Sequence, residues 1–311
     1  MTKPEILLIG DYPDWDMEGL TANYTCHQTP HEDLDAETAA RIRCVAFKGH
    51  SLFTAEMMAD MPNLGLIANF GVGYDVIDVA AASSRGIKVT NTPGVLTDDV
   101  ADLAVGMLIA ATRRLLPADA WVRSGDWAAK GNYPLLRTVT GKRAGIMGLG
   151  RIGRAIAERL VAFKMDIHYH SRAPKDTPSD WTYHADPVAM AGAVDYVIVA
   201  LSGGPETAGI VSKEVIAAVG PEGMLVNVSR GSTVDEEALI TALQSGALGF
   251  AALDVFAVEP ECDPRFGTLE NTLLQPHQAS ATIETRQAMG KLQLSNIQAF
   301  YAGTPLITPV N

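Results

Sequence analysis

Short apolar runs alternate along the whole of this chain with stretches of helical periodicity. In the first third the apolar runs predict β-strands, and the spacing between them leaves room for helices; the strands are expected at Ile6–Ile9, Arg43–Phe47, Leu64–Phe70 and Ile87–Thr90, with a helix at about Val76–Ser84. Parallel strands need crossover connections, which are usually helical. The alternation therefore predicts an α/β protein with parallel sheets.

The same alternation is stronger in the second half. Six further runs predict strands at Gly145–Met147, Asp166–Tyr169, Tyr196–Leu201, Met224–Val228, Phe250–Val255 and Thr272–Leu274. Ahead of them, the apolar stretch Val100–Leu116 predicts one long helix, which Thr97 or Asp98 would cap at its N-terminus. A last helix is predicted at Ile283–Tyr301.

The length of 311 residues exceeds what one hydrophobic core usually supports, so two domains are expected. Residues 98–280 carry enough strands for one complete dinucleotide-binding domain. We expect the last helix to return to the N-terminal region, so that residues 1–97 and 281–311 form a substrate-binding domain. The predicted fold class is α/β, with two Rossmann-like domains built on parallel sheets, the cofactor domain inserted in the substrate-binding domain, and a cleft between them.

A glycine-rich turn follows the apolar run that ends at Met147. Its residues, all assigned to cofactor binding, are Gly148, Leu149, Gly150, Arg151, Ile152 and Gly153. The first glycine permits a tight turn, the second lets backbone amides approach a pyrophosphate, and the third lets helix and strand pack closely. The helix that follows places its positive end at the phosphates. A glycine-rich turn without a ligand is the alternative interpretation.

The end of the next predicted strand bears on the choice of nicotinamide cofactor. A site that prefers NAD usually has Asp or Glu there, about 20 residues after the glycines, to hold the ribose hydroxyls. Here the strand ends in Ser171-Arg172, which can hydrogen-bond and pair with an adenosine 2′-phosphate, and Lys175 is near enough to assist. We therefore predict NADP(H), with NAD(H) as the alternative if Arg172 is only a surface residue.

Three polar residues follow successive late strands, where open α/β sheets build their sites. They are Arg230, Glu259 and His277. Histidine can donate a proton to an oxygen that becomes negative when hydride is added to its carbon, and a neighbouring carboxylate favours the charged imidazolium. Arginine binds a carboxylate through two parallel hydrogen bonds. The set predicts catalysis on a 2-oxo or 2-hydroxy acid, although each residue alone could be an ordinary surface or capping side chain.

These motifs resemble those of the D-isomer-specific 2-hydroxyacid dehydrogenases. The resemblance rests on Gly148–Gly153, Val228-Ser229-Arg230-Gly231, Leu253-Asp254-Val255-Phe256 with Glu259-Pro260, and Pro276-His277, and it extends to Asn69–Asp75 and Val89–Pro93. It implies that Arg230 binds the substrate carboxylate and carbonyl, that His277 is the acid or base, and that Glu259 pairs with it. It also implies that Asp254 contacts the nicotinamide carboxamide and that the amides of Val72 and Gly73 hold the substrate carboxylate. Further cofactor contacts are assigned to Thr97, Leu201 and Ser229.

Within that family, the Ser-Arg strand end together with Asn69–Asp75 is most similar to the glyoxylate/hydroxypyruvate reductase branch. NADPH generally supplies reductive chemistry, so reduction of a small 2-oxo acid is the expected direction. The resemblance also implies a homodimer, with the Val100–Leu116 helix as an interface element. Glu259 disfavours formate, because the formate dehydrogenases of this superfamily carry glutamine at that position.

Composition and charge narrow the partners. The formal net charge of −12 disfavours nucleic acid, and no apolar stretch approaches the ~20 residues of a membrane span. The three cysteines form no Cys-x-x-Cys pair, and Ile6–Ile9 is too short for a signal peptide, so a cytoplasmic protein is expected. No metal site is predicted: His168 and His170 share one face of a strand, but zinc there is disfavoured.

Two further functions stay open at this point. One is a nucleotide-sensing binding protein of the corepressor type on the same fold, and the other is an NAD-dependent D-2-hydroxyacid dehydrogenase with a different substrate. The loop Lys48–Leu52, which includes His50, follows an N-terminal strand and could select the side chain of the substrate, although a solvated loop is the simpler interpretation.

Overall fold

The computed structural model describes residues 3–49 and 51–311, so His50 lies outside the described residues. The chain divides into two compact units. The first contains the residues up to Leu96 together with Ser280–Asn311, and the second is Thr97–Ala279. Both are α/β units with parallel sheets, which confirms the predicted fold class.

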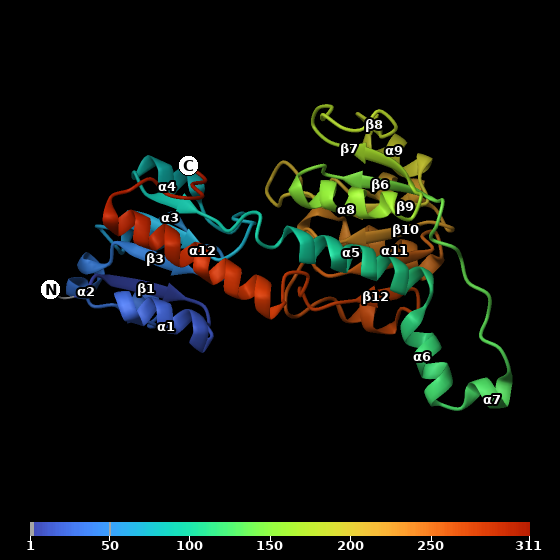
Figure 1. The fold of residues 1–311 in the computed structure, drawn as a ribbon, viewed down its shortest axis with the longest axis horizontal. Helices are drawn as coiled ribbons and strands as arrows, with labels where there is room; N and C mark the ends of the chain where they lie inside the picture. Colours follow the sequence, from blue (N-terminus) through green and yellow to red (C-terminus); the bar gives the residue numbers. More distant parts are fainter. Residues whose placement is uncertain (1–2, 50) are drawn as a thin grey trace. The chain divides into compact units, whose positions relative to one another are not determined.

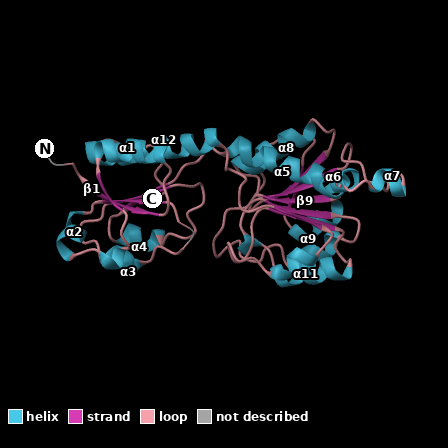
Figure 2. Ribbon diagram, turned by 90° about the horizontal axis from the view of Figure 1, so that it is seen from below, coloured by secondary structure: helices cyan, strands magenta, loops and turns pink. Residues whose placement is uncertain are grey.

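The first unit has a five-stranded parallel sheet in the order β2-β1-β3-β4-β5. Its strands are β1 (Glu5–Ile9), β2 (Thr25–His27), β3 (Cys44–Phe47), β4 (Leu66–Asn69) and β5 (Lys88–Thr90). Its helices are α1 (Asp14–Asn23), α2 (Ala36–Arg41), α3 (Ala55–Ala59), α4 (Val79–Ser84) and α12 (Ile283–Ala302), with a short 3₁₀ turn at His31–Asp33. Figure 2 shows α1 and α12 on one face of this sheet and α2, α3 and α4 on the other. Helices on both faces explain why β3 and β4 are buried at every position.

The second unit has a seven-stranded parallel sheet in the order β12-β11-β10-β9-β6-β7-β8. Its strands are β6 (Arg143–Met147), β7 (Asp166–His170), β8 (Thr182–His184), β9 (Tyr196–Val199), β10 (Met224–Asn227), β11 (Phe250–Leu253) and β12 (Thr272–Leu274). Its helices are α5 (Thr97–Thr112), α6 (Leu115–Arg123), α7 (Asp126–Lys130), α8 (Arg151–Val161), α9 (Pro187–Ala193), α10 (Lys213–Val219) and α11 (Glu236–Ser245), with 3₁₀ turns at Gly231–Thr233 and Pro264–Thr268. In Figure 1, α6 and α7 extend away from the sheet of this unit.

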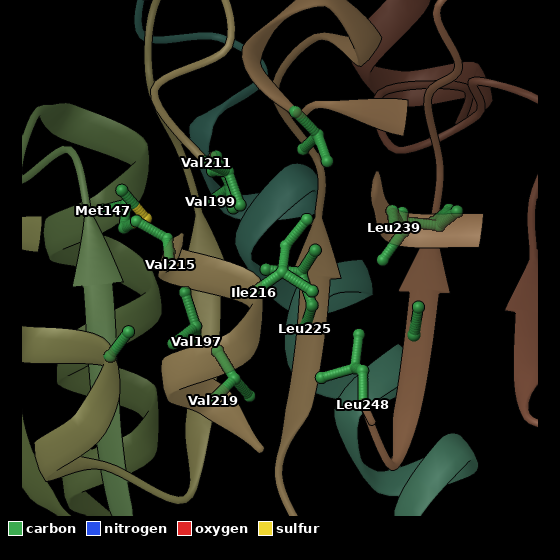
Figure 3. Close-up of a cluster of buried hydrophobic side chains, with 14 of the residues drawn as sticks. Met147, Val197, Val199, Val211, Val215, Ile216, Val219, Leu225, Leu239 and Leu248 are labelled. Carbon is green, nitrogen blue, oxygen red and sulfur yellow. The ribbon is translucent and has the colours of Figure 1, made fainter. Parts of the chain in front are cut away.

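The core of the second unit packs α9, α10 and α11 against one face of the sheet. Strand residues such as Met147, Val199 and Leu225 form one buried cluster with Ile216 of α10 and Leu239 of α11 (Figure 3). Burying a side chain of this size contributes about 1.5–3 kcal/mol. This packing fixes the strand ends, from which the polar site residues project.

The structure corrects three boundary expectations. The single helix expected over Val100–Leu116 ends at Thr112, because Arg114 has a left-handed backbone (φ 47°) that separates α5 from α6. That helix begins at Thr97 itself, so neither Thr97 nor Asp98 lies before it. The strands β2 and β8 were not expected, since both are short, partly exposed edge strands without an apolar run. Among the described helices, none is long and apolar enough to cross a membrane.

Candidate active site

The glycine turn lies between β6 and α8, at the point where the strand order of the second sheet reverses. Gly148 has φ 95°, and its N–H donates to the His170 carbonyl at 3.0 Å. Gly150 precedes the first residue of α8, and a Cβ there would meet no atom within 4 Å, which leaves room for a ligand beside the backbone. A Cβ at Gly153 would overlap the Gly148 carbonyl oxygen, so this glycine is needed for close packing of helix and strand. Each glycine thus has the geometry that a pyrophosphate turn requires.

The two residues that follow β7, Ser171 and Arg172, differ in how exposed their side chains are to solvent. Arg172 is 92% exposed and makes an ion pair with Glu206 at 3.3 Å between Nη1 and Oε2, and Glu206 is also exposed. Ser171 is buried, and its hydroxyl donates to the Ala173 carbonyl at 2.6 Å. The predicted roles of both residues stay predictions. The guanidinium of Arg172 is exposed to solvent, whereas the hydroxyl of Ser171 is already hydrogen-bonded within the chain.

Arg230 follows β10, and its backbone is held by neighbouring polar side chains. The Asn227 side-chain amide donates to the Arg230 carbonyl at 3.0 Å, and the Thr233 hydroxyl donates to the same oxygen at 2.7 Å. The Arg230 guanidinium donates to the Ser229 carbonyl at 2.9 Å. Ser229 itself is buried, and its hydroxyl donates to Asn227 Oδ1 at 2.9 Å. These contacts fix where the guanidinium stem leaves the strand end.

His277 and Glu259 come together although 18 residues separate them. The distance from His277 Nδ1 to Glu259 Oε2 is 2.6 Å, and the other carboxylate oxygen accepts the Phe256 N–H at 2.9 Å. Both side chains are partly buried. The carboxylate is therefore anchored at one oxygen and orients the imidazole with the other. Arg230, Glu259 and His277 all follow strands of one parallel sheet, at its carboxyl edge.

Asp254 holds the backbone around the histidine. Its side chain is fully buried, and its two carboxylate oxygens accept the N–H groups of Gln278 (2.8 Å) and Ala279 (3.0 Å). Its carbonyl accepts the His277 N–H at 2.8 Å, and His277 has a left-handed backbone with φ 51°. Such a conformation is uncommon for a non-glycine residue and persists only where its surroundings enforce it. Burial raises the pKa of Asp254, opposed by the two backbone hydrogen bonds.

Two of the remaining cofactor assignments, Thr97 and Leu201, lie in the second unit. Thr97 is the first residue of α5, and Leu201 follows β9, with a side-chain carbon 3.0 Å from the position of a Cβ at Gly148. The expected contact of Asp254 with the nicotinamide carboxamide stays a prediction. What the structure shows for that residue is attachment of the His277 segment.

The loop at Val72-Gly73 lies in the first unit, directly after β4. The Asn69 side-chain amide donates to the carbonyls of Gly71 (3.1 Å) and Gly73 (2.8 Å), and the Asn91 amide donates to the Val72 carbonyl at 2.8 Å. All three loop carbonyls are therefore turned toward the protein. Within the described residues, the N–H groups of Val72 and Gly73 have no hydrogen-bond acceptor in the chain. Two consecutive backbone N–H groups without an acceptor are suitable donors for an anion such as a carboxylate.

The sequence interpretation missed the residues that hold these loops. Asn69 and Asn91 were named only within the ranges Asn69–Asp75 and Val89–Pro93, with no role given to either side chain. Asn227 and Thr233 were not named, and Asp254 was assigned a ligand contact only. One signal could have identified two of them: Asn69 and Asn227 are polar residues that end otherwise apolar strands. A buried asparagine must satisfy its amide, and the adjoining loop backbone is the nearest source of acceptors.

Comparisons with known proteins agree with this geometry. The family model for the D-isomer specific 2-hydroxyacid dehydrogenase, NAD binding domain, matches residues 105–279. The chain is 45% identical to a glyoxylate/hydroxypyruvate reductase of Arabidopsis thaliana over 91% of this chain and 90% of that protein.

Two solved structures superpose over almost the whole chain. A 2-hydroxyacid dehydrogenase of Ketogulonicigenium vulgare Y25 is 53% identical, with a TM-score of 0.94, covering 100% of this chain and 99% of that one. An NADPH-dependent glyoxylate/hydroxypyruvate reductase of Sinorhizobium meliloti, crystallised with NADP and malonate, is 41% identical with a TM-score of 0.94, covering 99% and 97%. The order of the motifs, the two parallel sheets and these matches have one explanation: the chain belongs to the D-isomer-specific 2-hydroxyacid dehydrogenase family.

Proposed function

We propose that this protein is an oxidoreductase that uses NADPH to reduce small 2-oxo acids, such as glyoxylate or hydroxypyruvate, to 2-hydroxy acids. The observation that carries the proposal is the 2.6 Å contact between His277 Nδ1 and Glu259 Oε2. These two residues and Arg230 all follow strands at the carboxyl edge of the sheet that also carries the glycine turn. The relatives of known name that reduce 2-oxo acids, and the NADP complex of one of them, support it.

Different residues of the chain are proposed to bind the substrate and to deliver the proton. Bound NADPH supplies the hydride. Because Glu259 holds Nδ1, the other ring nitrogen, Nε2, is the one that would donate a proton to the substrate oxygen as negative charge develops there. Arg230 would bind the substrate carboxylate and polarise the neighbouring carbonyl, and the Val72 and Gly73 amides would share the carboxylate. Asp254 acts indirectly, by fixing the left-handed backbone of His277.

The residues proposed to hold the cofactor are in the second unit. The amides of Gly148–Gly153 and the N-terminus of α8 would bind the pyrophosphate, and Arg172 would pair with the 2′-phosphate. Thr97, Leu201, Ser229 and Asp254 would line the remainder of the site. NAD(H) would be accepted more weakly, because it lacks the phosphate that Arg172 binds.

The assay that tests the function is NADPH oxidation by the full chain with matched carbonyl compounds. Glyoxylate and hydroxypyruvate should be reduced, whereas the corresponding neutral aldehyde and ketone should not, because Arg230 and the Val72 loop need a carboxylate. In Glu259→Gln, reduction should be slower, since the imidazole loses the carboxylate that orients it. Tight NADPH binding without turnover on any 2-oxo acid would instead favour the nucleotide-sensing alternative.

A homodimer is proposed from one surface of the second unit. Leu115, Leu116 and Val122 of α6, with Trp127 of α7 and Leu135 beyond it, are each at least half exposed, and these elements extend away from the sheet (Figure 1). Apolar side chains gathered on a projecting segment usually mark a protein interface. A second copy of this chain is the proposed partner. Light scattering should give a dimer for the wild type and a monomer for Trp127→Glu, and a monomeric wild type would overturn this.

A cytoplasmic location is proposed because Cys26, Cys44 and Cys262 are all free thiols. Cell fractionation tests this location, and recovery with an oxidising compartment would contradict it.

A further inference from the structure

Two cations gather at the carboxyl edge of the first unit's sheet, and one of them, Lys48, begins the loop that the sequence offered as a selector of the substrate side chain. Lys48 directly follows β3, and its ammonium lies 4.9 Å from the centroid of the Phe70 ring and 5.3 Å from that of Tyr12. Arg286 of α12 places its guanidinium carbon 6.0 Å from the same Phe70 ring. Phe70 follows β4 and Tyr12 follows β1, so the cluster lies over the ends of three neighbouring strands.

The cluster lies at the point of the sheet where open α/β proteins usually bind ligands. The strand order β2-β1-β3-β4-β5 reverses between β1 and β3, and Lys48 follows one of these strands while Tyr12 follows the other. In open α/β sheets, ligands occupy the crevice outside the carboxyl ends at this switch point. The chain therefore places positive charge and aromatic surface at the preferred ligand position of this unit.

The two cations are incompletely satisfied by the chain. The Lys48 ammonium has three N–H donors and gives one hydrogen bond, to the Asp11 carbonyl at 2.6 Å. The described part of the chain provides neither Lys48 nor Arg286 with a carboxylate at ion-pair distance, although Lys48 does feel the charges of Asp11 and Asp16. Burial lowers the pKa of Lys48, and the charge of Arg286 lowers it further. Burial also lowers the pKa of Arg286. Asp16 and Asp11 partly offset the charge of Lys48. Two partly buried like charges without a carboxylate at ion-pair distance are still costly, and an anion between them would lower that cost.

The cation cluster is close to the Val72-Gly73 loop, whose two backbone N–H groups have no acceptor within the described residues. Phe70 and Val72 are two residues apart, so their Cα atoms are separated by at most about 7 Å. An acid held at one end by the Val72 and Gly73 amides therefore has its far end within reach of the cluster. Glyoxylate has no far end, whereas a 2-oxo diacid has a second carboxylate there.

From this we infer that Lys48 and Arg286 form a subsite for the second carboxylate of a 2-oxo dicarboxylic acid, and that such diacids are substrates of this enzyme. The inference rests on the proposed function, because it assumes that the 2-oxo acid end is reduced. Tyr12 and Phe70 support the cations through their ring faces and exclude water from one side of the subsite. Hydrogen bonds from an ammonium and a guanidinium suit a carboxylate oxygen pair.

The test compares kcat/KM for oxaloacetate and for glyoxylate with NADPH. Lys48→Met keeps the length of the side chain and removes its charge, so the oxaloacetate-to-glyoxylate ratio should fall about 10- to 150-fold, the loss expected for one charge-assisted hydrogen bond. Arg286→Met should lower the ratio in the same sense. Lys88→Met is the matched control, because Lys88 is an exposed lysine at the start of β5 and should leave the ratio unchanged.

Binding without turnover gives a second readout. Calorimetry of the NADPH-bound full chain should show that malonate binds less tightly to Lys48→Met than to wild type, with acetate affected much less. Thermal unfolding of each variant checks its fold, and Lys48→Met decides the matter if Arg286→Met does not fold. A ratio that is unchanged in Lys48→Met, with unchanged malonate binding, overturns the subsite. Failure of the wild type to reduce glyoxylate overturns the proposed function instead, so the two failures are distinguishable.

Discussion

Replacing Arg172 with alanine tests the cofactor preference most quantitatively. The side chain is 92% exposed, and its partner Glu206 lies 3.3 Å away and is also exposed. An exposed pair of this kind contributes about 0–1 kcal/mol, so little is lost when the guanidinium turns to another anion. A hydrogen bond between charged groups contributes about 1.5–3 kcal/mol.

Subtracting the pair from the new contact leaves a net contribution of about 0.5–3 kcal/mol to NADPH binding, or roughly 2- to 150-fold in Kd. Fluorescence titration of both cofactors should therefore show that Arg172→Ala weakens NADPH by this factor and NADH by less than about twofold. Glu206→Gln should strengthen NADPH, since it removes both the competing partner and a negative charge. Equal losses for NADPH and NADH in Arg172→Ala would refute the assignment of Arg172 to the 2′-phosphate.

Further predictions concern the proton donor, the substrate anchor, the turn and the histidines of the second sheet. His277→Gln should lower turnover about 10²–10⁴-fold with NADPH binding retained by titration, whereas equal loss of both would point to misfolding. Arg230→Lys should stay badly impaired in glyoxylate kinetics, because lysine keeps the charge but not the two-pronged geometry; full activity would exclude that role. Gly153→Ala should cost about 1–3 kcal/mol in denaturant unfolding, since its Cβ would overlap the Gly148 carbonyl oxygen. Burial and the neighbouring imidazole of His184 lower the pKa of His168, and burial and His170 lower the pKa of His184. The two rings are 2.8 Å apart between Nδ1 of His168 and Nε2 of His184. Their contribution to the stability of the fold is therefore complete above pH about 6.5 and is lost as the pH falls below that value. The melting temperature of His184→Gln should consequently decline less between pH 7 and pH 5 than that of wild type, and parallel declines would contradict this.

Several strands that were predicted from sequence share one property, a continuous apolar run buried on both faces of a sheet. The strands β3, β4, β9 and β10 are buried at every position, and each matched an apolar run to within a few residues. The edge strand β8 has exposed and partly exposed positions, so its pairing with β7 depends on tertiary position and leaves no periodic signal. The break after Thr112 was hidden for a related reason, because Leu115 and Leu116 continue the apolar pattern while pointing to solvent.

The sequence identified the single polar residues that follow the strands, but not the contacts that hold their loops in place. His277 and Glu259 could be paired from sequence because each follows a strand of one sheet, and their side chains do meet. The left-handed backbone of His277 and the two amides held by Asp254 could not be foreseen, since they depend on a side chain 23 residues earlier being buried beneath the loop. The same holds for Lys48 and Arg286, which approach one ring from distant parts of the sequence.

The central claim is hydride transfer from NADPH to C2 of a 2-oxo acid, with the proton delivered by His277. Its most direct test is the reduction of hydroxypyruvate with NADPH that carries deuterium at the transferable position of the nicotinamide, followed by mass and chiral analysis of the product. The account predicts glycerate of the D configuration with deuterium at C2, formed rapidly by the wild type and hardly at all by His277→Gln. Unlabelled product, L-glycerate, or the absence of any NADPH oxidation by the wild-type enzyme would contradict it.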